Sequence, residues 1–117
     1  MKILLVDDDG LAAEMTSAIL ESEDHEVVLA NHGIEALEIL SGMKDIEMII
    51  SDLHMPFLDG LELFAEARTQ GYTMPFVLLT GDDPKAALEA QPGLDACLLK
   101  DFSLQDDLPS VIARIMA

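Results

Sequence analysis

The sequence predicts an α/β fold in which helices cover both faces of a parallel β-sheet. Short, almost wholly apolar runs alternate with segments whose apolar residues recur at helical spacing, the pattern of successive βα units. Strands that are apolar throughout are typical of a parallel sheet buried on both faces. At 117 residues the chain is long enough for one domain with its own core, and we expect residues 1–117 to form it. The predicted architecture is a three-layer α/β/α sandwich.

The strands are expected at the apolar runs, and the segments between them as helices. In chain order the expected strands are Ile3–Val6, Val27–Ala30, Met48–Ile50, Phe76–Leu79 and Ala96–Leu99. The apolar stripes expected to face the sheet from the first three helices are Leu11, Met15, Ala18 and Ile19, then Ile34, Leu37 and Leu40, then Leu61, Phe64 and Ala65. Asp59 is expected to cap the third helix.

The last two helices have recognisable ends. The fourth is predicted to be short, because Asp83 can cap it, Pro84 suits its first turn and Gln91-Pro92-Gly93 ends it. The fifth is predicted to begin at an N-cap Ser103. Its buried face is expected to comprise Leu104, Leu108, Val111, Ile112 and Ile115.

Composition excludes several classes of function. The net charge is −17, from 23 acidic against 6 basic residues, so the basic surface of a nucleic-acid binder is absent and anionic membranes are disfavoured. No apolar run approaches the roughly 18 residues of a membrane span. The single cysteine, Cys97, cannot form an internal disulfide and is expected in the core. We expect a cytoplasmic protein.

Polar residues follow the apolar runs at positions that favour a phosphoryl-transfer site. Asp7 and Asp8 follow the first run, Asp52 the third, Thr80 the fourth and Lys100 the fifth. The carboxyl ends of parallel strands meet at one edge of the sheet, where ligands of α/β proteins bind. The three carboxylates suit Mg²⁺. Asp52 could then act as a nucleophile, with the Thr80 hydroxyl and the Lys100 ammonium contacting the transferred group.

These strand-end residues resemble the motifs of the receiver domain of bacterial two-component response regulators. The resemblance covers essentially the whole chain. It rests on the acidic cluster Asp7-Asp8-Asp9, on the stretch from Asp52 to Gly60, on Thr80-Gly81 and on Lys100-Asp101-Phe102. Each motif alone is also compatible with a solvated turn, a helix cap or a surface charge. Their shared placement after successive strands favours the functional interpretation.

The resemblance implies a flavodoxin-like fold with strand order 2-1-3-4-5, as in single-domain, chemotaxis-type regulators. We expect no output domain within residues 1–117, and it is left open whether the chain acts alone, relays phosphate onwards or is a fragment of a larger regulator. It also implies that a sensor histidine kinase or a histidine phosphotransfer protein phosphorylates Asp52, which changes binding to a downstream protein target. Mg²⁺ would be held by Asp8 directly, by Asp7 through water, and by Asp52 and the backbone carbonyl of His54. Slow self-dephosphorylation would be the only catalytic activity, so we expect no enzyme. Whether phosphorylation also produces a homodimer is left open.

The chain departs from the family pattern at two positions, Asp101 and Cys97, and carries His54 and Asp82 at two positions that vary within the family. Asp101 follows Lys100 where the family usually has proline after a cis bond, so we expect a trans bond here, because a non-proline cis bond costs about 2.5–4 kcal/mol. Cys97 occupies the position of the aromatic residue that turns inward on activation. His54 and Asp82 occupy positions that tune the lifetime of the phosphate in the family.

The sequence is also compatible with two other functions. The chain could be a receiver-like scaffold that binds its partner regardless of phosphate, which the departures at Asp101 and Cys97 favour. It could instead be a Mg²⁺-dependent aspartyl-phosphate phosphohydrolase. Haloacid-dehalogenase-type enzymes, however, place a second acid two residues after the nucleophile. This chain has His54 at that position after Asp52, or Asp9 if Asp7 were the nucleophile.

Overall fold

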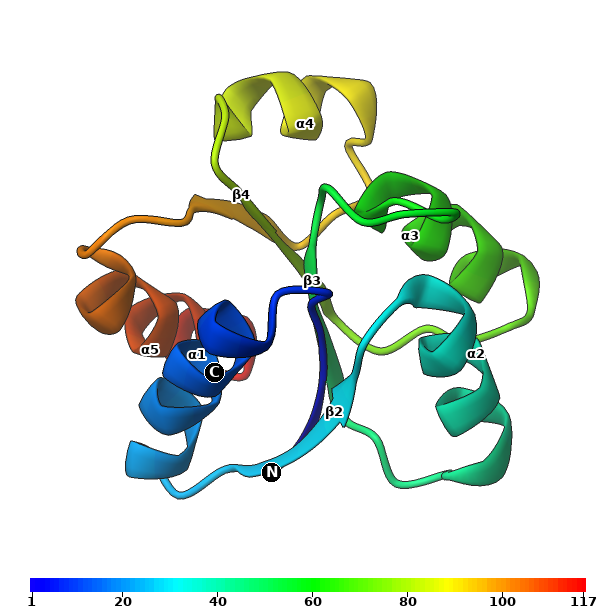
Figure 1. The fold of residues 1–117 in the computed structure, drawn as a ribbon, viewed down its shortest axis with the longest axis horizontal. Coiled ribbons are helices and arrows are strands. Elements are labelled where there is room, and N and C mark those ends of the chain that lie inside the picture. The colour runs from blue at the N-terminus through cyan, green and yellow to red at the C-terminus, as the bar shows by residue number, and fades with distance from the viewer.

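The computed structural model describes residues 1–117 as alternating strands and helices (Figure 1). The strands are β1 (Lys2–Val6), β2 (Glu26–Ala30), β3 (Met48–Asp52), β4 (Phe76–Thr80) and β5 (Ala96–Leu99). The helices are α1 (Gly10–Ser22), α2 (Gly33–Gly42), α3 (Gly60–Thr69), α4 (Pro84–Ala90) and α5 (Leu104–Ile115). Every expected strand is confirmed, and the third and fourth extend far enough to include Asp52 and Thr80 as their last residues.

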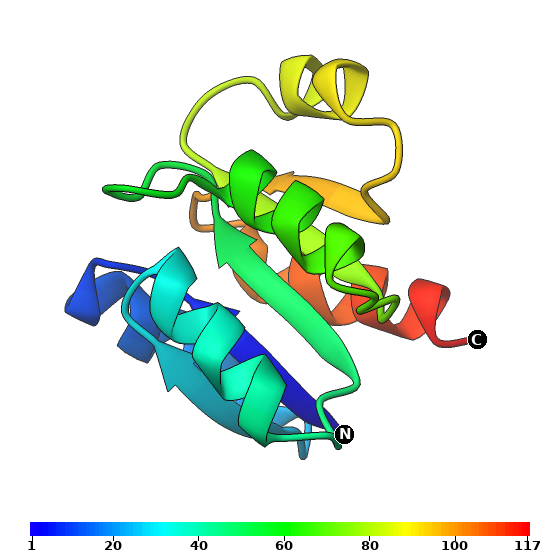
Figure 2. The same ribbon diagram turned by 90° about the vertical axis from the view of Figure 1, so that its right-hand side faces the viewer.

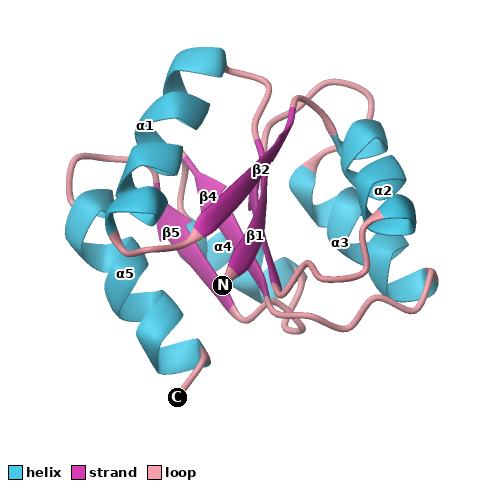
Figure 3. Cartoon of the chain, turned by 90° about the horizontal axis from the view of Figure 1, so that it is seen from below, coloured by secondary structure: helices cyan, strands magenta, loops and turns pink.

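The strands form one parallel sheet in the order β2-β1-β3-β4-β5, as the resemblance implied. Helices α1 and α5 lie on one face of the sheet and α2 and α3 on the other (Figure 3). Figure 2 shows the strands twisting across the middle of the molecule between these helices. The predicted three-layer sandwich is therefore confirmed.

Alternate residues of the central strands supply two separate cores. The first core packs under α2, α3 and α4 and includes Leu4, Ile49 and Leu78. The second packs under α1 and α5 and includes Leu5, Ile50 and Leu79. Because successive side chains of a strand point to opposite faces, an unbroken apolar run serves both cores. The edge strand β2 is the exception, since only Ala30 of this strand is buried.

The stripe predicted to bury α1 is wrong except at Ile19, which packs against the second core. Leu11 and Met15 are 68% and 65% exposed, and the helix instead turns Ala13, Thr16 and Leu20 towards the sheet. Small side chains at the first two positions let the helix backbone approach the strands closely. Leu11 and Met15 remain on the outer side of the helix. Their spacing shows that they share one face, but it does not show whether other residues cover that face.

Two smaller corrections have the same cause. In α2, Ile34 is exposed while Ala36 and Leu40 are buried. Of the stripe predicted for α3, Ala65 is exposed. The predicted face of α5 is confirmed, with Leu104, Leu108, Val111 and Ile112 buried and Ile115 packed at the margin.

The predicted helix ends agree with the structure in all but one detail. Asp59 caps α3 in a capping box with Glu62, and Asp83 caps α4 ahead of Pro84. Ser103 is the N-cap residue of α5, but its side chain makes no capping hydrogen bond. The structure contains no helix of the length and hydrophobicity needed to cross a membrane.

Candidate functional site

The predicted site residues lie together at the carboxyl edge of the sheet. Asp7 and Asp8 follow β1, Asp52 ends the neighbouring β3, and Thr80 ends β4. The register sets their depth, because Val6 pairs with Ser51 and Asp52 pairs with Leu79. Strand pairing thus places residues that are far apart in sequence at the same position along the strand direction.

Three carboxylates and one ammonium converge at this edge. Oxygen atoms of Asp7, Asp8 and Asp52 lie within 4.8 Å of one another. The Lys100 ammonium donates to Asp7 Oδ2 at 3.1 Å and lies 3.5 Å from Asp52 Oδ2. A set of three carboxylates at this separation, open on the exposed Asp8 side, fits the hard, oxygen-seeking character of a divalent cation such as Mg²⁺.

Burial and charge act on the site in opposite directions. Asp7 is 2% and Asp52 7% exposed. Burial raises the pKa of Asp52 and the charges of Asp7 and Asp8 add to the rise, while Lys100 opposes it. Burial acts to lower the pKa of Lys100, but the charges of Asp52 and Asp7 outweigh it and the pKa is raised. The Lys100 ammonium therefore stays charged, but its one positive charge does not balance the negative charges of the three carboxylates.

Thr80 is fully buried at the end of β4. Its hydroxyl oxygen accepts a hydrogen bond from the Asp82 backbone N–H at 3.0 Å, which leaves the hydroxyl proton free to donate. Its backbone carbonyl accepts from the Lys100 N–H at 2.7 Å. This bond fixes the end of β5, and with it the base of the lysine, beside the end of β4.

The segment after Asp52 is held close to the sheet by a glycine. A Cβ at Gly60 would lie 2.5 Å from the Asp52 carbonyl oxygen and 2.5 Å from Leu78 Cδ1, so only glycine fits there. The Gly60 N–H donates to the Leu53 carbonyl at 2.8 Å and closes the loop between β3 and α3. The start of α3 therefore buttresses the backbone of Asp52.

Asp101 has a structural role that the sequence analysis missed. The Lys100–Asp101 bond is trans, as expected, since the chain contains no cis peptide bond. Asp101 Oδ1 accepts from the Ser103 backbone N–H at 2.9 Å and from the Ser103 hydroxyl at 2.6 Å. This is an Asx turn, which the Asp-x-Ser pattern could have indicated. It shapes the loop after Lys100 where the family usually has proline.

His54 and Asp82 form a pair across the mouth of the site. His54 Nε2 and Asp82 Oδ2 lie 2.6 Å apart and link the loop after β3 to the loop after β4. Both side chains are exposed. The sequence points to each residue separately but does not predict their contact, because the relative positions of two loops cannot be read from spacing.

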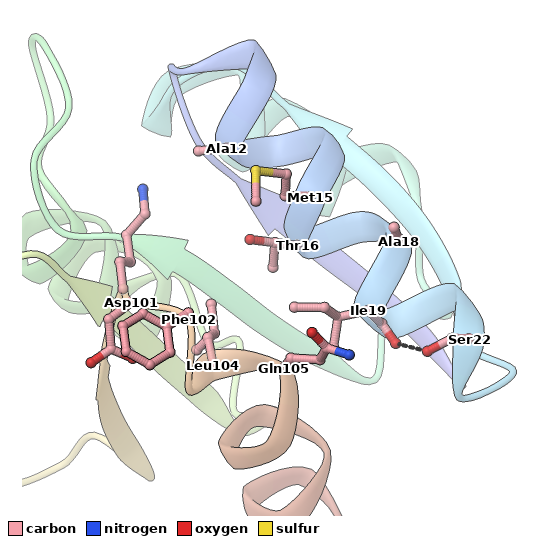
Figure 4. A pocket seen from close by; sticks show the side chains of 11 residues that line it. Ala12, Met15, Thr16, Ala18, Ile19, Ser22, Asp101, Phe102, Leu104 and Gln105 are labelled. Atoms are coloured by element: carbon pink, nitrogen blue, oxygen red, sulfur yellow. Dashed lines mark hydrogen bonds between the residues drawn. The ribbon is translucent and has the colours of Figure 1, made fainter.

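An open apolar groove of about 710 Å³ borders the site between α1 and the start of α5. Figure 4 shows Met15 and Thr16 on the α1 side and Phe102 on the opposite side. Lys100 also lines the groove, so the groove and the acidic site share a residue. Of the α1 stripe that was expected in the core, Met15, Ala18 and Ile19 line this groove.

The response-regulator receiver domain is the protein family that matches residues 3–112. The chain belongs to this family. Curated relatives include a transcriptional regulatory protein, the CpxR homolog of Haemophilus influenzae, 38% identical over 99% of this chain and 49% of that protein. The response regulator MprA of Mycobacterium leprae is 37% identical over 100% of this chain and 50% of its own length. The chain thus spans about half the length of these relatives.

Solved receiver structures have the same fold. The response regulator TrrA of Thermotoga maritima, solved in complex with Mg²⁺ and BeF, matches with a TM-score of 0.86 at 27% identity, covering 97% of this chain and 96% of that one. The chemotaxis protein CheY4 of Vibrio cholerae matches with a TM-score of 0.84 at 30% identity, covering 97% and 96%. The flavodoxin-like architecture that the resemblance implied is therefore shown.

Proposed function

We propose that Asp52 of this receiver domain accepts a phosphoryl group from a phosphohistidine of a sensor kinase or phosphotransfer protein. The proposal rests on the cluster of the Asp7, Asp8 and Asp52 carboxylates, whose negative charge exceeds the positive charge of the one ammonium beside them. That ammonium, Lys100 Nζ, lies 3.5 Å from Asp52 Oδ2. Receiver domains are phosphoacceptors that regulate partners, and this geometry supports the same role at this edge.

The transfer requires little beyond position and charge. An Asp52 carboxylate oxygen attacks phosphorus, the new O–P bond forms, and the P–N bond to the donor imidazole breaks with its electron pair returning to nitrogen. Lys100 and the free hydroxyl proton of Thr80 contact the phosphoryl oxygens. Gly81 leaves room beside them, because a Cβ there would meet nothing within 4 Å.

Mg²⁺ is the cation that we propose for the site, since it would neutralise the carboxylates and the incoming phosphoryl oxygens together. Asp8 and Asp52 would bind it directly and Asp7 through water. The backbone carbonyl of His54 completes the proposed set. The TrrA complex with Mg²⁺ and BeF shows that a related receiver holds this cation.

The proposed output is a change in the binding of a downstream protein in the cytoplasm, with hydrolysis of the aspartyl phosphate returning the domain to its resting state. Water attacks phosphorus in that step, the O–P bond breaks, and inorganic phosphate leaves. We propose no turnover of external phosphate esters. Haloacid-dehalogenase-type enzymes have a second acid two residues after the nucleophile, and the residue two after Asp52 is His54.

Intact mass after incubation with acetyl phosphate tests the proposal. Wild type should gain one phosphoryl group in the presence of Mg²⁺ and none with a chelator, while Asp52→Asn should gain none. A folded wild type that gains nothing from acetyl phosphate or from phosphohistidine donors would contradict the proposal. That result would favour the phosphorylation-independent scaffold.

A further inference from the structure

Phe57 occupies a backbone conformation that an aromatic residue rarely adopts. Its φ is 70°, and the Leu58 N–H donates to the Pro56 carbonyl at 2.8 Å. A bond between residues two apart around a central residue of positive φ defines the rarer, strained form of γ-turn. Glycine suits this region, whereas a bulky side chain there is an outlier.

The rest of the protein holds this turn in place. Met55 and Leu58, on either side of Phe57, pack against the core beneath α2 and α3. Leu58 is also close to Gly33, where a Cβ would lie 2.8 Å from Leu58 Cδ2. The loop is therefore fixed at both sides of the turn, and Phe57 projects from it.

The Phe57 ring gains nothing from the fold. It is 89% exposed, so its burial does not compensate for the backbone conformation. A strained backbone and a solvated aromatic ring in one residue are both unfavourable to the isolated domain. Strained positions that persist in proteins cluster at sites of function.

The position of Phe57 indicates which partner covers it. The loop starts directly after Asp52, so a protein that brings a phosphoryl group to Asp52 must cover this edge of the sheet. Exposed aspartates border the same edge: Asp8, Asp9, Asp82, Asp83 and Asp101. With a net charge of −17, a second copy of the chain is repelled, and a partner with basic residues around an apolar cleft is complementary.

We propose that Phe57 is an anchor residue for the protein that phosphorylates this domain, inserting its ring into an apolar cleft of that donor. The proposal rests on the proposed function, because it presumes that a protein donor approaches Asp52. It predicts that Phe57 contributes to donor binding and contributes nothing to the chemistry at the carboxylate. Small phosphodonors should therefore be indifferent to it.

Phe57→Gly separates the two roles, with Phe57→Tyr as the conservative variant and Met116→Ser as the matched control. Met116 is an exposed apolar residue at the end of α5, at the opposite edge of the sheet. The assays are phosphorylation by acetyl phosphate, phosphotransfer from a panel of autophosphorylated histidine kinases and phosphotransfer proteins of the source organism, and thermal unfolding.

Phe57→Gly should raise the Tm by about 4 °C, because glycine relieves the positive φ. Its rate with acetyl phosphate should equal that of wild type. Its kcat/KM with the donor that best phosphorylates wild type should fall about tenfold through a higher KM. Phe57→Tyr should restore transfer, and Met116→Ser should transfer like wild type.

Two results would overturn the inference. Equal kcat/KM of wild type and Phe57→Gly with the protein donor would show that the ring is not an anchor, even if a downstream target binds it. Phosphorylation of wild type by acetyl phosphate but by no protein in the panel would also overturn it. Absence of phosphorylation by every donor would instead contradict the proposed function, so the two failures are distinguishable.

Discussion

At the scale of the residue, the burial that places Asp52 at the reaction site also lowers the stability of the metal-free fold. The carboxylate lies among Asp7 and Asp8 with one ammonium to share, and its pKa is raised by burial first and by these charges second. Charge that is unfavourable without a cation becomes favourable with one. Binding of Mg²⁺ is thus coupled to stability through these three side chains.

Asp52→Asn should therefore raise the Tm at neutral pH in the presence of a chelator. The pKa of Asp52 in the folded state lies above its unfolded value of 3.8. In the pH window between these two pKa values, the folded state binds a proton that the unfolded state has released. Stability then falls as pH rises through that window, and the neutral amide avoids the loss. Thermal unfolding from pH 3 to pH 7 checks this. A lower Tm of the variant at pH 7 would contradict it.

Cys97 should be an unreactive thiol. Burial first, and the charge of Asp83 second, raise its pKa from 9.0 to about 11. Since the thiolate is the nucleophile, two pKa units imply alkylation by iodoacetamide about a hundredfold slower in the folded chain than in the unfolded chain at pH 8. Mass spectrometry of timed samples measures both rates. Equal rates would show that the thiol is accessible and ionised.

At the scale of the element, the carboxyl end of β3 and the start of α3 form one unit. Gly60→Ala places a Cβ 2.5 Å from the Asp52 carbonyl oxygen, which is backbone and cannot move aside cheaply. We expect a loss of about 1–3 kcal/mol in the free energy of unfolding and slower phosphorylation by acetyl phosphate. Urea unfolding and intact mass measure these effects.

The control for this change is Gly42→Ala in α2. A Cβ at Gly42 meets nothing within 4 Å, and alanine is the better helix former. This variant should be as stable as wild type or more stable, with normal phosphorylation. If Gly60→Ala behaved like Gly42→Ala, the close contact between α3 and the Asp52 backbone would contribute neither to stability nor to phosphorylation, which would contradict this prediction.

The outer stripe of α1 gives a second prediction at this scale. Met15→Gln should change the free energy of unfolding by less than about 0.5 kcal/mol, because Met15 is exposed. Leu20→Ala in the same helix should cost about 2–5 kcal/mol, because Leu20 is buried. Urea denaturation compares them. A large loss for Met15→Gln would restore the original expectation that the stripe is core.

These elements also show what the sequence could and could not predict. The strands were predictable because each is an apolar run ended by polar residues, and their ends determine where Asp52 and Lys100 lie. The buried face of α1 was not, because helical spacing places Leu11 and Met15 on a face without saying what covers that face. The turn at Phe57 and the contact of His54 with Asp82 depend on loop paths, which have no period.

At the scale of the whole molecule, charge and size act together. The protein measures 32 × 30 × 30 Å and carries a net charge of −17. At about 0.01 M ionic strength the screening length is about 30 Å, so every charge interacts with all the others. Self-repulsion therefore opposes the folded state in dilute buffer.

Adding NaCl from about 0.01 M to about 0.5 M should raise the Tm of the metal-free protein, because screening then acts within roughly 4 Å. The same series on Asp52→Asn should show a similar slope, since the effect belongs to the whole surface. Scanning calorimetry measures both. A Tm that falls with salt would mean that attractive ion pairs, and not net repulsion, dominate the electrostatics of the fold.

The central claim, that Asp52 is the phosphoacceptor, is tested most directly by locating the phosphoryl group. Borohydride reduces an aspartyl phosphate to homoserine, which peptide mass spectrometry can place in the chain. After incubation with acetyl phosphate and Mg²⁺, homoserine should appear at position 52 alone, and a chelator should abolish it. Homoserine at another aspartate, or none at all in the folded protein, would contradict the account.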